Sequence, residues 1–454
     1  MNHARAIPQY APVATVTSSA GPWGFAEFFV ISQTALPALL YLPGTQGFRL
    51  GIRFSAFAIS LAALAWFLVQ PSRPRAHPAT KAVVTIMLLM GAMLGHPSTP
   101  SLVGGLAHIA VYFAVLAPVF WAPAFVRSPE HFARLMGLLL ICSGVNSIVG
   151  VLQVYDPATW MPAELSRVIT EGAVGLGPVT YIGPNGQTVI RPPGLFDTPG
   201  SVAGPGMFAA LLGAVFGLSA IPLWQRAGAF LMAAAGVAAI YLSQVRVTLV
   251  ILVLMIGAYA AILFVQRRAS KATIFGGMAA AMIVISFVVA VTLGGETVVT
   301  RVMSLFVDDP VSVYYHARGA QLDYTLSELL YEFPFGAGLG RWGMAAGYFN
   351  QSNTPSLWAE IQITGWMIDG GVPMVVLYGG TLLFASMFDS RVARRTSTPR
   401  VAACGAVVFA ANLGTLVMII SFTPFVTQIG VQYWFLAGAL QGVVACQETG
   451  DRRQ

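Results

Sequence analysis

The sequence predicts an all-α polytopic membrane protein, and three observations lead to this fold class. Of the 454 residues, 56% are hydrophobic. Only 9% are charged, whereas a soluble domain carries about 25%. The apolar residues form blocks of roughly 20, the length of helix that crosses a bilayer. A soluble enzyme, a disordered chain, a nucleic-acid-binding protein and a secreted disulfide domain are therefore excluded as descriptions of the whole chain.

The apolar blocks predict about twelve transmembrane helices. Their ranges are 23–42, 51–69, 82–96, 104–125, 134–154, 201–222, 227–243, 245–265, 272–294, 366–388, 401–422 and 429–446. Five helices thus fall within 23–154, four within 201–294 and three within 366–446. The proline-containing stretch 1–22 is expected to be a cytoplasmic tail and not a signal peptide, and 447–454 a second tail. All three cysteines fall in apolar blocks, so no disulfide framework is expected.

The distribution of basic residues predicts the orientation of these helices. If both ends of the chain are cytoplasmic, sixteen Lys and Arg residues lie in inside segments and eight in outside segments. An excess of basic residues marks the cytoplasmic side of a membrane protein. Two long connections, 155–200 and 295–365, then both lie outside. Long connections commonly carry function, so the candidate residues are sought there.

Two arginines next to the outer ends of predicted helices are candidate phosphate ligands. Arg246 opens an apolar run, with Ser243 and Gln244 before it. Arg191 precedes a segment rich in proline and glycine that leads into the sixth predicted helix. A guanidinium can donate two parallel hydrogen bonds to a phosphate. The alternatives are that Arg246 reaches the lipid headgroups and that Arg191 is a solvated residue at a helix entry.

The second long connection contributes three further candidates. Leucines recur at helical spacing after Arg318, which predicts an amphipathic helix from Arg318 to Phe333. Arg318 and His316 are candidate substrate-binding residues, although Arg318 could instead pair with Asp323 on the surface and His316 could be structural. Arg341 ends a glycine-rich stretch that follows no strand. That stretch therefore fails the context of a nucleotide-binding loop, and the alternative is a turn packed on other backbone.

Two acids stand at the mouth of the tenth predicted helix. Glu360 is a candidate general base if partial burial raises its pKa. Asp369 lies near the membrane, where an unpaired charge is costly and commonly functional. The alternative is that both carboxylates balance nearby arginines. The sequence contains no cluster of His, Cys and Asp at metal-ligand spacing and no Walker motif, so neither a metal nor another cofactor is expected.

These segments, in this order, resemble the superfamily of O-antigen ligases and O-antigen polymerases of the bacterial envelope. The resemblance covers roughly residues 190–380. Its motifs are Arg191-x-x-Gly194-x-Phe196-x-x-Pro199, Ser243-x-x-Arg246, Arg318 in a loop helix, Pro334-Phe-Gly336-x-Gly338-x-Gly340 and the acidic element that begins at Asp369. The resemblance implies a multi-pass enzyme of the bacterial inner membrane with its active site facing the periplasm.

The resemblance also implies a reaction and a set of partners. An acceptor glycan or lipid would attack a glycan linked to undecaprenyl pyrophosphate, without a metal, and Arg191 and Arg246 match the arginines that hold the pyrophosphate. Other polysaccharide export proteins and membrane lipid are implied partners. One departure favours a polymerase over a ligase: the ligase pattern has a His-Asn pair about nine residues before the acid, and Glu360 stands there instead.

A transporter or flippase of lipid-linked sugars is a second hypothesis, and a structural or assembly protein is a third. A transporter should carry ionisable residues inside the membrane, along its pathway. The cores of the predicted helices are nearly free of charge, with Glu27 as the main exception. The sequence therefore favours the enzyme.

Overall fold

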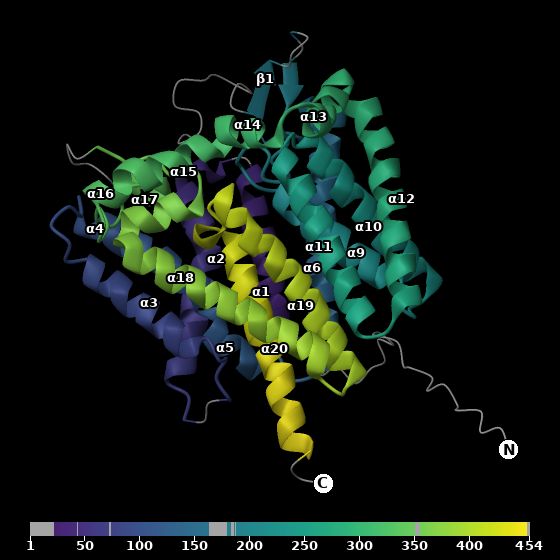
Figure 1. Ribbon diagram of the computed structural model, residues 1–454, viewed down its shortest axis with the longest axis horizontal. Helices are drawn as coiled ribbons and strands as arrows, with labels where there is room; N and C mark the ends of the chain where they lie inside the picture. The colour runs from purple at the N-terminus through teal and green to yellow at the C-terminus, as the bar shows by residue number, and fades with distance from the viewer. Residues whose placement is uncertain are drawn as a thin grey trace.

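The computed structural model describes residues 22–42, 44–71, 74–162, 179–182, 186, 188–349 and 355–451. The predicted tail 1–22 lies almost wholly outside the described residues, as does the centre of the first long connection. Most of the predicted C-terminal tail continues the last helix, α20 (Gln428–Asp451). Figure 1 shows a helical assembly in which the C-terminus lies at the lower end.

Within the described residues, nine helices are long and apolar enough to cross a membrane. They are α2 (Arg49–Leu68), the pair α4 (Leu102–Leu116) and α5 (Pro118–Phe125), α6 (Pro129–Tyr155), α10 (Leu223–Leu242), α11 (Arg246–Val265), α12 (Ala269–Gly294), α18 (Gln362–Arg395), α19 (Pro399–Val417) and α20. Three shorter apolar helices accompany them: α1 (Phe25–Ala38), α3 (Thr80–Met93) and α9 (Ala203–Gly217). The all-α membrane class is confirmed, and every predicted block contains one of these helices. That all twelve cross the membrane stays a prediction.

Glycines bring α9 and α10 into close contact. A Cβ atom at Gly206 would lie 2.8 Å from the carbonyl oxygen of Gly236, and one at Gly213 would lie 2.5 Å from that of Ala229. Small residues of this kind let helix backbones approach closely in membrane proteins. The close packing fixes the end of α10, from which the turn to α11 departs.

The two long connections contain secondary structure of their own. In the first, β1 (Thr180–Ile182) pairs antiparallel with β2 (Thr188–Ile190), after the short helix α7 (Pro157–Trp160). The second contains α13 (Glu296–Val307), α14 (Pro310–Tyr314), α15 (Ala320–Tyr324), α16 (Leu330–Glu332) and α17 (Gly343–Phe349), with π-helical turns at Tyr315–Gly319 and Thr325–Leu329. Figure 1 places β1, α13, α14 and α15 along the upper edge, opposite the C-terminus.

The amphipathic loop helix begins earlier than the sequence predicted. The expected start was Arg318, but a continuous helical path begins at Pro310. Asp309 caps this path, because its carboxylate accepts hydrogen bonds from the backbone N–H groups of Val311 and Ser312. Proline at the first helical position supports the same start.

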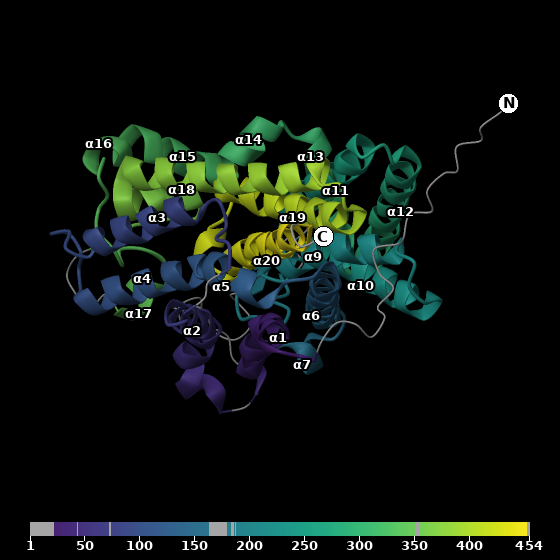
Figure 2. The same ribbon diagram turned by 90° about the horizontal axis from the view of Figure 1, so that it is seen from below.

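Helix α18 is interrupted at Gly370 and Gly371, and the glycine-rich stretch packs into the break. Gly371 has φ +64, and a Cβ atom there would lie 2.6 Å from the backbone nitrogen of Gly336. The N–H of Val372 donates to the carbonyl oxygen of Pro334 over 2.9 Å. The glycine-rich stretch is therefore a turn packed on other backbone, which was the alternative to a nucleotide-binding loop in the sequence analysis. Figure 2 shows α14, α15 and α18 on one side of the assembly, with α1 and α2 on the opposite side.

Candidate functional site

Arg191 lies over the turn that connects α10 to α11. Its Nε atom is 3.4 Å from the carbonyl oxygen of Ser243. Gly200, with φ +69, passes beneath it, and a Cβ atom there would lie 3.2 Å from Arg191 Nη2. Glycine at this position therefore allows the proline-rich approach to bring Arg191 onto the turn. The side chain reaches a segment that is more than fifty residues away in the sequence.

Arg246 begins α11 at the end of the same turn. Its Nη1 atom donates a hydrogen bond of 2.6 Å to Ser304 Oγ on α13. The backbone of Gln244, within this turn, is in the left-handed region with φ 61. Gln244 is only 5% exposed, and its Oε1 atom has no hydrogen-bond partner among the described residues. The structure thus brings the two candidate phosphate ligands, Arg191 and Arg246, to one turn.

A buried ion cluster ties the approach segment to α2. Asp197 is 6% exposed. Its carboxylate forms ion pairs with two arginines. Arg49 Nε lies 3.0 Å from Asp197 Oδ2, and Arg53 forks onto both carboxylate oxygens, at 3.0 Å through Nε and 2.5 Å through Nη2. Bidentate pairs of this kind fix geometry. Sequence reasoning missed this cluster, because Asp197 lies about 150 residues from its partners and no local pattern joins them.

Glu360 and Arg318 form an ion pair at the mouth of α18. Their side chains are 31% and 40% exposed. Arg318 Nε also lies 3.3 Å from the carbonyl oxygen of Ser421. The backbone N–H of Glu360 donates to Gln321 Oε1 over 2.6 Å. Among the described residues, the alternative surface pair of Arg318 with Asp323 is not found; Asp323 accepts a hydrogen bond from the Tyr315 hydroxyl over 3.4 Å.

His316 and Arg341 have different surroundings. His316 is exposed, and its ring lies edge-on to Tyr315 with centroids 6.0 Å apart. Arg341 is only 7% exposed. Its guanidinium donates to the carbonyl oxygens of Ala337 (3.3 Å) and Pro355 (3.2 Å), and it forms no ion pair with a carboxylate among the described residues. Arg341 therefore holds the glycine-rich turn in place.

Two tyrosines of the loop helices remain neutral hydroxyl groups at physiological pH. Burial raises the pKa of Tyr314 and of Tyr324 above the ordinary value for tyrosine. The negative charges of Glu328 and Glu332 raise the pKa of Tyr324 further, whereas Arg341 lowers it. The hydroxyl of Tyr314 donates to the carbonyl oxygen of Ile420 over 3.1 Å. These side chains anchor the loop helices to the bundle.

Asp369 is completely enclosed, one residue before the break in α18. Its Oδ2 atom accepts a hydrogen bond of 2.8 Å from the Tyr112 hydroxyl. Its Oδ1 atom accepts one of 2.9 Å from Trp342 Nε1. His108 Nε2 also lies 2.9 Å from Oδ1, although this contact lacks the geometry of a hydrogen bond. His108 and Tyr112, both on α4, are more than 250 residues away in the sequence and were missed there.

The turn that carries Arg191 and Arg246, here called the arginine turn, and the Glu360–Arg318 pair are two separate groups, and one continuous segment takes part in both. Among the described residues, no hydrogen bond or ion pair joins Arg191 or Arg246 to Glu360 or Arg318. The segment α13–α16 nevertheless contributes Ser304 to the first group and Arg318 to the second. Figure 1 shows this segment crossing the upper end of the bundle.

Comparison with known proteins adds nothing to this geometry. No protein-family model matches the chain, and no curated protein sequence matches it significantly. In the described part of the chain, no group of three or more His, Cys, Asp or Glu side chains is placed to hold a metal ion. The residues that most directly suggest a function are therefore Arg191 and Arg246 at the arginine turn.

Proposed function

We propose that this chain is an inner-membrane glycosyltransferase that polymerises oligosaccharide units linked to undecaprenyl pyrophosphate, for an exopolysaccharide or an O-antigen, on the periplasmic face. The observation that carries the proposal is the convergence of Arg191 and Arg246 on one turn. Two forked guanidinium groups at the end of a helical bundle suit a membrane-bound pyrophosphate. The partly charged loop helices above them supply surface for a glycan.

In the proposed reaction, an acceptor hydroxyl attacks the anomeric carbon of the lipid-linked glycan. A new carbon–oxygen bond forms while the bond from that carbon to the pyrophosphate oxygen breaks. The electron pair leaves with the pyrophosphate, where Arg191 and Arg246 stabilise the developing negative charge. The hydroxyl proton passes to a base, for which Glu360 is proposed, with Arg318 orienting the carboxylate.

Two alternatives remain in the proposal. The same site could transfer a finished glycan to lipid A core, as a ligase does. A transporter or flippase of lipid-linked sugars is favoured by one observation, namely that α18 extends past the predicted range 366–388 and contains a second completely buried acid, Asp389. The glycan profile of a deletion strain separates these functions. Loss of a polymerase leaves single repeat units attached to lipid A core, and loss of a ligase abolishes the attachment. Loss of a flippase abolishes both polymer formation and attachment.

Substitution of the two arginines tests the proposal directly. Arg191→Ala and Arg246→Ala should each abolish long-chain polymer at unchanged protein abundance. Lys should restore little, because an ammonium group cannot form the fork. Arg301→Ala is the matched control, since Arg301 is exposed on α13, one turn from Ser304. Normal chain length in either Ala variant would remove that arginine from the site, and normal length in both would overturn the proposal.

The proposed base has a separate test. Glu360→Gln keeps the size of the side chain but removes its basicity, so polymer formation should fall by about 10²-fold or more. Glu328 is an exposed acid on the loop helices, and Glu328→Gln should leave polymer formation unchanged. Polymer of normal length in Glu360→Gln would leave the arginine site in place but return Glu360 to the role of a partner for Arg318. His316 would then be the next residue to test as the base.

A further inference from the structure

A second polar pair lies inside the bundle, between α18 and α19. Asp389 and Asn412 are both 0% exposed. Asn412 Nδ2 donates a hydrogen bond of 2.9 Å to Asp389 Oδ2. The remaining oxygen of each side chain, Oδ1 in both, has no hydrogen-bond partner among the described residues. Two buried acceptors thus remain unsatisfied on the two side chains that already contact each other.

Among the described residues, the neighbours of this pair supply no further donor. On α18, the Ser386 hydroxyl lies 3.2 Å from the Tyr433 hydroxyl of α20. Tyr433 donates instead to the carbonyl oxygen of Leu382, over 2.9 Å. On the side of α3, the ring of His77 lies against Phe388, with centroids 4.9 Å apart. Burial lowers the pKa of His77 to about 3, so these polar neighbours are neutral at physiological pH.

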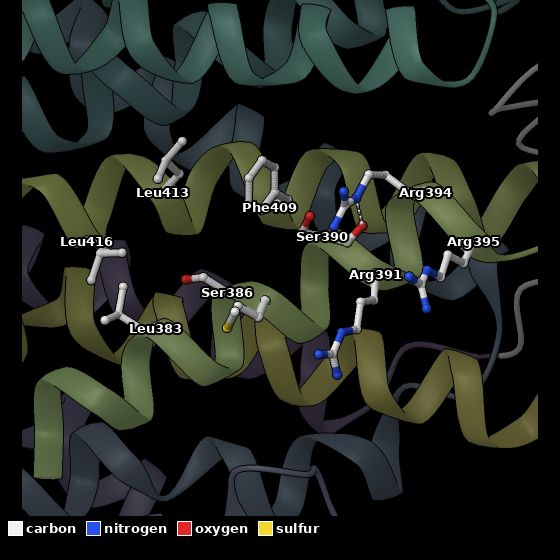
Figure 3. Close-up of a pocket in the computed structure, with 10 residues that line it drawn as sticks. Leu383, Ser386, Ser390, Arg391, Arg394, Arg395, Phe409, Leu413 and Leu416 are labelled. Atoms are coloured by element: carbon white, nitrogen blue, oxygen red, sulfur yellow. Dashed lines mark hydrogen bonds between the residues drawn. The ribbon is translucent and has the colours of Figure 1, made fainter.

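The nearest cationic side chains on α18 belong to a groove. Arg391, Arg394 and Arg395 line it, together with Ser386, Ser390 and Phe409. Figure 3 shows these arginines around the outer part of the groove, with Arg394 hydrogen-bonded to Ser390. Arg394 Nε donates to the Ser390 carbonyl oxygen over 3.2 Å. Asp389 forms no ion pair within the described residues, so no cation compensates a charge on it.

An ionised Asp389 would be expensive in this position. A buried carboxylate without a cationic partner is strongly destabilised, and the single hydrogen bond from a neutral amide offsets only a small part of that cost. The amide oxygen of Asn412 would also remain unsatisfied. A proton on Asp389 Oδ1 removes both problems, because the new O–H group can donate to Asn412 Oδ1. The carboxylic acid and the carboxamide then form a ring of two complementary hydrogen bonds.

We propose that Asp389 and Asn412 form a proton-binding site inside the helix bundle, in which Asp389 carries a proton at neutral pH and shares it with Asn412. When the proton is bound, two hydrogen bonds join α18 to α19. When it leaves, a negative charge and two unsatisfied acceptors remain between the helices, and the contact weakens. The site lies on the same helix as Asp369 and the Gly370–Gly371 break. It is independent of the proposed enzymatic function.

Infrared spectroscopy of the purified full-length protein in detergent tests the site. The wild type at neutral pH should show the carbonyl stretching band of a protonated carboxylic acid, and Asp389→Asn should lose it. Glu332→Gln should retain the band, since Glu332 is an exposed acid outside this site. Absence of the band in the wild type, or its persistence in Asp389→Asn, would overturn the proposal.

Thermal unfolding provides a second measurement on the same proteins. Asp389→Asn should fold, because two carboxamides can form the same pair of hydrogen bonds without a proton. The wild type should lose thermal stability as the pH is raised and Asp389 ionises. The Asn variant should lose less over the same interval. Equal losses in the two proteins would also overturn the proposal.

Discussion

Helix α18 contains two completely buried aspartates that differ in their hydrogen-bond donors. Asp369 accepts hydrogen bonds from Tyr112 and Trp342 and touches His108, so groups from α4 and the glycine-rich turn surround it. Asp389, twenty residues further along, accepts one hydrogen bond, from Asn412. Burial is the same for both side chains, at 0% exposure. The two aspartates therefore differ in the number of hydrogen-bond donors to the carboxyl group and not in burial.

This difference assigns the two acids different roles. Donors that point at both oxygens of Asp369 stabilise a carboxylate, and they connect α4, the turn at Trp342 and the break in α18. A carboxylate at Asp389 lacks that support, and a neutral acid fits the site better. Asp369 is therefore a structural connection near the candidate site, whereas Asp389 is a site that can gain or lose a proton. Each of the following changes tests one side of this comparison.

Removal of the Asp369 carboxylate should have the largest effect. Asp369→Ala leaves the Tyr112 hydroxyl and the Trp342 indole N–H buried without an acceptor, and each such group costs about 1–3 kcal/mol. We expect a loss of about 3–5 kcal/mol, measured as a lower midpoint of thermal unfolding in detergent. Asp323→Ala, at an exposed acid, serves as control. A smaller loss than that of Asp389→Ala would reverse the comparison.

Closing the space at the break in α18 should have the next largest effect. In Gly371→Ala, the new Cβ atom would lie 2.6 Å from the backbone nitrogen of Gly336, at a residue with φ +64. Overpacking and the left-handed backbone together should cost about 2–4 kcal/mol. Gly379→Ala is the matched control on the same helix, because nothing lies within 4 Å of a Cβ atom there. Similar unfolding midpoints for the two variants would show that the turn does not depend on this close approach.

Loss of one donor should have a moderate effect. Tyr112→Phe removes the hydroxyl group that donates to Asp369 Oδ2 over 2.8 Å. A hydrogen bond to a charged acceptor contributes about 1.5–3 kcal/mol, and the variant should be less stable by roughly that amount. Tyr331→Phe, at an exposed tyrosine, should be neutral. A loss of only about 1 kcal/mol, the contribution of an ordinary neutral hydrogen bond, would contradict this expectation.

The smallest effect is expected at Asn412. Asn412→Asp replaces the amide with a second acid, and the pair can then share one proton between two carboxyl groups, as paired carboxyl groups do. At acidic pH the variant should be about as stable as the wild type. Above neutral pH it should become the less stable protein, because two acids then lose protons inside the bundle. Unfolding midpoints recorded across pH check this, and equal profiles for variant and wild type would contradict it.

Much of the fold followed from local sequence. Blocks of roughly 20 apolar residues predicted where the helices lie, because each residue in a spanning segment must meet apolar surroundings wherever its neighbours are. Arg191, Arg246, Glu360 and Asp369 were chosen as candidates from the sequence alone, since polar residues beside such blocks stand out, and their functional roles stay predictions. The early start of the loop helix at Pro310 was missed, although Asp309 is a readable cap.

Only the tertiary structure decided which polar side chains meet. Asp197 with Arg49, Asp369 with Tyr112 and Glu360 with Arg318 join residues far apart in the sequence. No periodicity encodes such pairs, because they depend on which helices pack together. The same holds for Asp389, which the sequence placed just past the end of a predicted helix. The packing of α18 on α19 encloses it beside Asn412, and that enclosure determines its chemistry.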